Sequence, residues 1–138
     1  MPVSNCWKHL INNQTKQQME KIIDKIKTFE DACKEAGITE DQVFSTTDTP
    51  DEKAFKKLKL IIKVINEGWV PDWNNLSQRK WFPWFRLSSG FGFSHSFFFY
   101  VISDSGVGSR LCFETEEKCD YVASQFLEIY EEFITFKS

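Results

Sequence analysis

The sequence predicts an α+β fold with N-terminal helices, a short antiparallel β-meander of about three strands, and a C-terminal helix packed on the sheet. Apolar residues recur at helical spacing in the first half, aromatic residues and glycines fill the middle, and one broad apolar face ends the chain. The 138 residues suit a single domain. We divide it into a helical part (1–68), an aromatic loop and sheet (69–113) and a C-terminal helix (114–138).

Two short helices are expected near the N-terminus. Isoleucines at helical spacing predict the first over 14–27. Thr28, with Asp31 three positions on, is a typical N-cap signal for the second, which Gly37 is expected to end. The polar stretch 40–50 that follows is expected to be a loop.

The clearest helix start lies at 49–52, where an N-cap threonine precedes a proline and two acidic residues. Apolar residues then recur as far as Ile65, and Gly68 is expected to close the element. Five lysines fall mostly on the opposite face: Lys53, Lys56, Lys57, Lys59 and Lys63. Such a face can bind anions, but it is more often the solvated side of an amphipathic helix.

The middle of the chain changes in composition, since twelve aromatic residues lie within 69–100. Two prolines predict an ordered, aromatic-pinned loop over 69–83. Alternation around 91–93 and the β-rich run 97–102 predict strands, and 110–113 is expected to be the return strand.

The last element is strongly periodic. Thr115 is the expected N-cap, with acidic residues in the first turn. The expected apolar face comprises Cys119, Val122, Ala123, Phe126, Leu127, Tyr130, Phe133 and Ile134. A face this broad on so short a chain is expected to cover the sheet.

Charge is distributed unevenly along the chain. The net charge is −3, which argues against a strongly electrostatic, non-specific nucleic-acid binder. The segment 69–113 carries four basic against two acidic residues, whereas the part from Glu114 onward carries two against seven. The acidic tail is most simply a solvated helix face.

The expected compartment is the cytoplasm, without a membrane. The N-terminus lacks the apolar run of a signal peptide, and no window has the ~18 apolar residues of a membrane span. Four isolated cysteines (Cys6, Cys33, Cys112, Cys119) are expected to be small core residues in a reducing compartment. The two histidines have no ligand-spaced partner, so we expect neither a metal nor a cofactor.

Four motifs carry a resemblance: Gly68-Trp69-Val70-Pro71-Asp72-Trp73-Asn74-Asn75, Arg79-Lys80-Trp81-Phe82-Pro83-Trp84-Phe85, Ser89-Gly90-Phe91-Gly92-Phe93-Ser94 and Val107-Gly108-Ser109-Arg110-Leu111-Cys112-Phe113. Together they resemble small uncharacterised proteins encoded by bacteriophages and mobile elements of gut anaerobic bacteria. The resemblance covers about residues 50–138 and implies a phage or mobile-element context. It implies no activity.

The aromatic and basic segment is the expected binding surface. Its members are Trp73, Arg79, Lys80, Trp81, Trp84, Arg86, Phe91 and Phe93. Tryptophan and arginine are favoured anchors of protein interfaces, and basic residues interleaved with aromatic rings also suit single-stranded nucleic acid. An arginine on a tryptophan is equally a structural cation–π pair. We expect at least one of Trp73, Trp81 and Trp84 to be substantially exposed.

Catalysis has little support in the sequence. Ser94-His95-Ser96 places a base beside two hydroxyls, but adjacent strand residues face opposite ways and do not converge. We therefore expect a non-catalytic accessory protein that binds another macromolecule, most simply a protein. The alternative is single-stranded nucleic-acid binding through residues 73–93.

Overall fold

Helices and one β-hairpin follow one another along the chain. The structure, a computed structural model, describes residues 22–88, 92–103 and 105–135, of which Ser88 and 92–99 are described as backbone alone. Residues 22–25, at the end of the first expected helix, are helical, and the rest of that helix lies outside the described residues. The further elements are α2 (Phe29–Ala36), α3 (Glu40–Val43), α4 (Pro50–Ile65), β1 (Lys80–Ser88), β2 (Gly92–Val101), α5 (Glu116–Gln125) and α6 (Leu127–Thr135).

The expected caps begin and end the helices. At α2, the Thr28 hydroxyl accepts from the Asp31 amide at 3.1 Å, and the Asp31 carboxylate accepts from the Thr28 amide at 3.0 Å. Gly37 ends the helix in the left-handed region, with φ of 70°. At α5, the Thr115 hydroxyl accepts from the Lys118 amide at 3.2 Å. These starts were predictable because caps are local.

Helix α4 begins as predicted, and Thr49 before it forms hydrogen bonds with two acidic side chains of the first turn. The Glu52 carboxylate accepts from the Thr49 amide at 2.8 Å, and the Thr49 hydroxyl donates to the Asp51 carboxylate at 2.6 Å. The cap thus also holds an acidic side chain beside the positive end of the helix.

Replacing Thr49 with alanine is expected to lower the free energy of unfolding by about 1 kcal/mol, because the hydroxyl of the cap is lost. Chemical denaturation followed by circular dichroism measures this change. Thr46, exposed in the preceding loop, is the matched control, and its alanine variant should stay within about 0.5 kcal/mol of wild type. Equal midpoints for the two variants would contradict a stabilising role for Thr49.

The loop expected over 40–50 contains one helical turn, α3, so that expectation was wrong in part. Thr39 precedes the turn, and its amide donates to the Gln42 side chain at 2.9 Å. This hydrogen bond between polar residues stabilises a turn that hydrophobic periodicity does not reveal.

The sheet has two strands in the described residues, and the expected three-stranded meander is corrected. Strands β1 and β2 pair antiparallel, with an irregularity after Trp84: Trp84 lies opposite Phe97, and Phe85 opposite His95. The expected return strand over 110–113 is reduced to one bridge between Phe113 and Trp81. It therefore adds a single pairing to β1 instead of a third strand.

The first part of strand β1, residues 80–83, occupies the end of the loop that we expected over 69–83. Pro83 lies inside the strand, opposite Phe98. Each strand of a two-stranded ribbon has one open edge, where a residue without an N–H group is tolerated. The proline therefore marks an edge strand here and does not interrupt it.

The expected C-terminal helix is divided into α5 and α6 at Phe126. This residue has φ of −113° and ψ of 31°, and its carbonyl accepts from the amides of Ile129 and Tyr130 at 3.1 and 3.2 Å. The Phe126 side chain is buried in the core. The turn thus lets both helices pack, and the sequence contains no glycine or proline that would have predicted it.

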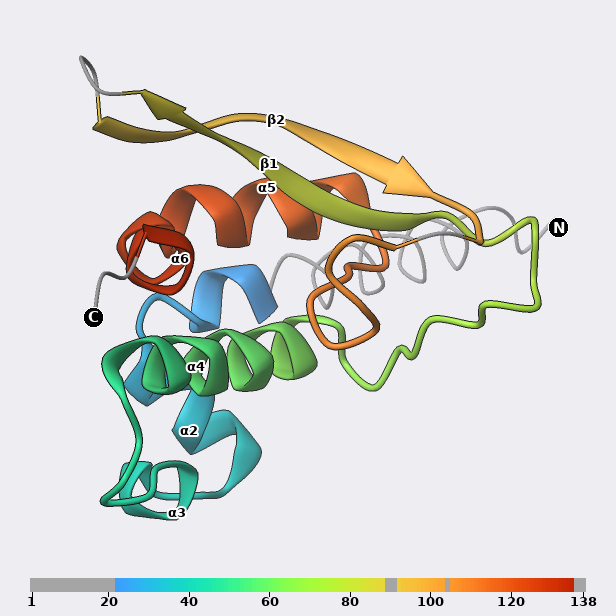
Figure 1. Cartoon of the computed structure of the whole chain (residues 1–138). Helices are drawn as coiled ribbons and strands as arrows, with labels where there is room; N and C mark the ends of the chain where they lie inside the picture. Colours follow the sequence, from blue (N-terminus) through green and yellow to red (C-terminus); the bar gives the residue numbers. More distant parts are fainter. Residues whose placement is uncertain (1–21, 89–91, 104, 136–138) are drawn as a thin grey trace, which may run out of the picture.

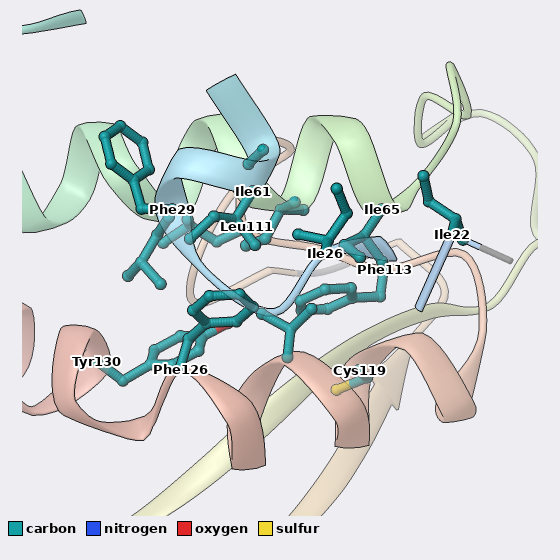
Figure 2. Close-up of a cluster of buried hydrophobic side chains, with 14 of the residues drawn as sticks. Ile22, Ile26, Phe29, Ile61, Ile65, Leu111, Phe113, Cys119, Phe126 and Tyr130 are labelled. Carbon is teal, nitrogen blue, oxygen red and sulfur yellow. The ribbon is translucent and has the colours of Figure 1, made fainter. Parts of the chain in front are cut away.

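The elements stack in layers with a shared core (Figure 1). The hairpin lies over α5, and α4 lies on the other side of α5 and α6, with α2 packed on α4. Buried side chains from α2, α4, α5, α6 and the segment 111–113 meet in one cluster between α4 and α5 (Figure 2). Its members include Ile26, Phe29, Leu58, Ile61, Ile62, Ile65, Phe113, Phe126 and Tyr130.

A buried asparagine joins the end of α4 to the chain that enters α5. The Asn66 side-chain amide donates to the Cys112 carbonyl at 2.9 Å, and its oxygen accepts from the Glu114 amide at 3.2 Å. Two backbone groups that face the interior are thereby satisfied. The segment 112–114 is fixed against the helical layer by this side chain.

Candidate functional site

Lys80, expected on the binding surface, lies in the interior. It is fully buried, and its Nζ donates to the backbone carbonyls of Ile102 (2.6 Å), Gln78 (3.1 Å) and Asn75 (3.2 Å). Three acceptors match the three donors of an ammonium group, which offsets the cost of removing the charge from water. The prediction that Lys80 lies on the binding surface is therefore wrong. Lys80 is a buried cation that organises the loop before β1.

Trp73 covers this ammonium group. The Lys80 Nζ lies 5.2 Å from the centroid of a Trp73 ring, and the indole Nε1 donates to the Ser109 hydroxyl at 2.7 Å. The indole is half-buried. Both its face and its donor are engaged within the protein, so this tryptophan is fixed in place by structural contacts.

Arg79 and Trp81 meet at Tyr100. The Arg79 guanidinium carbon lies 4.7 Å from the Tyr100 ring centroid, and the Tyr100 and Trp81 rings lie 5.1 Å apart. The backbone of Trp81 also pairs with Phe113 in both directions, at 2.7 and 3.0 Å. The cation–π pair considered for this segment exists, but its ring belongs to a tyrosine across the sheet.

Trp84 is the tryptophan that the hairpin exposes. Its exposed fraction is 52%, and Arg86, two residues along β1 and also exposed, lies on the same side of the strand. The expectation that at least one of the three tryptophans is substantially exposed is confirmed. Of the other predicted members, Phe91 lies outside the described residues, and Phe93 lies opposite Leu87 with only its backbone described.

A second concave feature was not predicted as a site. It is a groove of about 710 Å³, hereafter the α4 groove, between α3, α4 and the chain that follows α4. Its apolar floor consists of Ile38, Val43, Leu60, Ile62, Trp69, Val70 and Pro71. Its cationic lining consists of Lys56, Lys59, Lys63 and Arg110, and the lining contains no carboxylate.

The four cations of the α4 groove differ in their partners. Lys56 forms an ion pair with Asp48 at 2.7 Å, and this hydrogen bond lowers the pKa of the Asp48 carboxyl. Lys59, Lys63 and Arg110 are exposed and have no ion pair with any residue that the structure describes. Sequence reasoning grouped the lysines but missed Arg110, because only the folded chain brings residue 110 to α4.

The cysteines of the described chain lie in the core. Cys33, Cys112 and Cys119 are buried, and burial raises the pKa of each thiol, so each stays protonated near neutral pH. Cys6 lies outside the described residues. The described residues contain no group of three or more histidine, cysteine or acidic side chains that could hold a metal ion.

Comparison of the chain with protein-family models, with curated proteins and with solved structures found no match. Among the residues that the structure describes, no helix has the length and apolar character needed to cross a membrane. A functional conclusion therefore rests on the residues of the chain itself.

Proposed function

We propose that this chain is a small, non-catalytic accessory protein of the phage or mobile-element type, which acts in the cytoplasm by binding another protein. The observation that carries this proposal is the half-exposed indole of Trp84 beside Arg86 on the hairpin. Tryptophan and arginine are enriched among the residues that dominate protein-interface energies. The phage or mobile-element context is proposed from the resemblance of the four sequence motifs alone.

The arrangement of the aromatic segment favours a protein over a single-stranded nucleic acid. A stacking platform needs several open rings along a cationic groove. Trp73 and Trp81 are partly buried and engaged within the protein, and Lys80 is fully buried.

The hairpin surface is tested by capture and by variants. Tagged wild-type protein is used to capture its partner from host lysate with and without nuclease, and binding of the purified partner is then measured by calorimetry. Trp84→Ala is expected to weaken this binding about thirtyfold, the effect of removing an interface anchor worth about 2 kcal/mol. Leu76→Ala removes an apolar side chain outside the hairpin that is even more exposed than Trp84 and should leave affinity unchanged.

Two outcomes would contradict the proposal. Capture that nuclease abolishes, together with salt-reversible quenching of tryptophan fluorescence by a single-stranded oligonucleotide, would assign the hairpin to nucleic acid. Equal affinities of Trp84→Ala and Leu76→Ala for the purified partner would remove the hairpin from the interface.

A further inference from the structure

The α4 groove combines an apolar floor with three cations, Lys59, Lys63 and Arg110, that form no ion pair within the described residues. Lys56, Lys59 and Lys63 lie three and four residues apart on α4, so they form one stripe about 10 Å long. Arg110 comes from a distant segment of the chain and lines the same groove. Lys56 is paired with Asp48, whereas the other three cations are exposed to solvent and form no ion pair with a carboxylate of the described residues.

The neighbouring hollow shows that this bias is not general to the surface of α4. That hollow is lined by Lys25, Lys63, Glu35 and Glu67 among its charged residues, so its charges balance. Lys25 and Glu35 are moreover paired with each other at 2.8 Å. The excess of positive charge in the α4 groove is therefore local, in a chain whose net charge is −3.

The lining restricts the chemistry of an occupant. An inorganic anion would meet the cations but leave the apolar floor uncovered, and Val70 already exposes 71% of its surface. A neutral apolar ligand would cover the floor but leave the cations uncompensated. A segment with acidic side chains on one side and apolar side chains on the other satisfies both parts of the lining.

We propose that the α4 groove is a docking site for an acidic, amphipathic helical segment of a partner protein. The apolar face of the segment covers Leu60, Trp69 and Val70, and its carboxylates approach Lys59, Lys63 and Arg110. A stripe of about 10 Å corresponds to about two turns of a bound helix lying along α4. The groove includes no hairpin residue, so this docking is independent of the surface around Trp84.

A designed peptide tests the proposal directly. The probe is a fluorescein-labelled helical peptide of about four turns, with leucines at i, i+3, i+4 and i+7 and glutamates on the remaining face. Fluorescence anisotropy measures its binding to the full chain. The double variant Lys59→Glu/Lys63→Glu is expected to weaken binding about tenfold or more, and Val70→Ser about threefold. Added salt is expected to weaken binding by wild type.

Matched variants separate the groove from general electrostatics and from folding. Lys53→Glu reverses one lysine charge on the same helix outside the groove lining and should keep nearly the wild-type affinity. All substituted side chains are exposed, and circular dichroism verifies that each variant is folded. Trp84→Ala should bind the peptide like wild type, so failure of the hairpin proposal and failure of this one are distinguishable.

Several results would overturn the docking proposal. These are absence of peptide binding by wild type, equal weakening by Lys53→Glu and the double variant, or equal binding of a peptide with lysine in place of glutamate. Sedimentation in which wild type self-associates and the double variant does not would assign the groove to a second copy of the chain. Preferential binding to vesicles of anionic lipid, lost in the double variant, would assign it to a membrane surface.

Discussion

Replacing Phe113 with alanine is expected to lower the free energy of unfolding by about 4 kcal/mol. The side chain is fully buried in the core cluster, among residues of α4 and α5 (Figure 2). Truncation removes most of the buried ring and leaves a cavity that packed neighbours fill only in part. The loss is large against the 5–15 kcal/mol or so that keeps an ordinary domain folded.

Urea denaturation followed by circular dichroism measures this change as a shift of the midpoint at constant slope. Val107→Ala is the control, because Val107 belongs to the same segment but is exposed, and its variant should differ from wild type by about 0.5 kcal/mol or less. A Phe113→Ala variant as stable as this control would mean that Phe113 does not anchor the segment after β2 to the helices.

Lys80→Met is expected to destabilise the protein by about 3 kcal/mol. Hydrogen bonds to a charged group contribute about 1.5–3 kcal/mol each, and three carbonyls lose their donor at once. Removal of a buried charge offsets part of this loss. Methionine nearly preserves the volume of the side chain, so the change reports mainly on the ammonium group.

Hydrogen exchange locates the effect of Lys80→Met. Amides in the loop over 72–79 should lose protection, because Asn75 and Gln78 no longer share a donor with Ile102. Lys53 is the control: its exposed side chain makes no hydrogen bond in the described part of the chain, so Lys53→Met should match wild type in stability and in exchange. If Lys80→Met were as stable as wild type, the three hydrogen bonds from the Lys80 ammonium group to backbone carbonyls would make no net contribution to the free energy of unfolding.

The helices were predictable because their signals are local. The caps at Thr28, Thr49 and Thr115 each involve residues within three positions, and each helix begins where its cap indicated. The hairpin was predicted less well, because strand pairing is non-local. Pro71 and Pro83 indicated a loop over 69–83, whereas pairing with β2 makes the segment from Lys80 onward a strand.

The sequence predicted which residue types gather in the candidate surface, but it did not predict which of their side chains are exposed. Tryptophans and cations do gather in this segment, but the neighbours of each depend on distant residues. Lys80 is buried because Ile102, 22 positions away, supplies a carbonyl, and Arg79 is engaged because Tyr100 lies across the sheet. Among the predicted members whose side chains the structure describes, Trp84, Arg86 and Arg79 are exposed, and Arg79 is held by its contact with Tyr100.

The two hydrogen bonds of the Asn66 side-chain amide, hereafter the Asn66 clamp, affect the rates of folding and unfolding. Its partners lie 46 and 48 residues along the chain, and closing a loop of that length costs about 3 kcal/mol of chain entropy. Two hydrogen bonds, worth about 1 kcal/mol each, do not offset this cost alone. The clamp therefore forms after the hydrophobic core has brought its partners together, and it lengthens the lifetime of the folded state more than it accelerates folding.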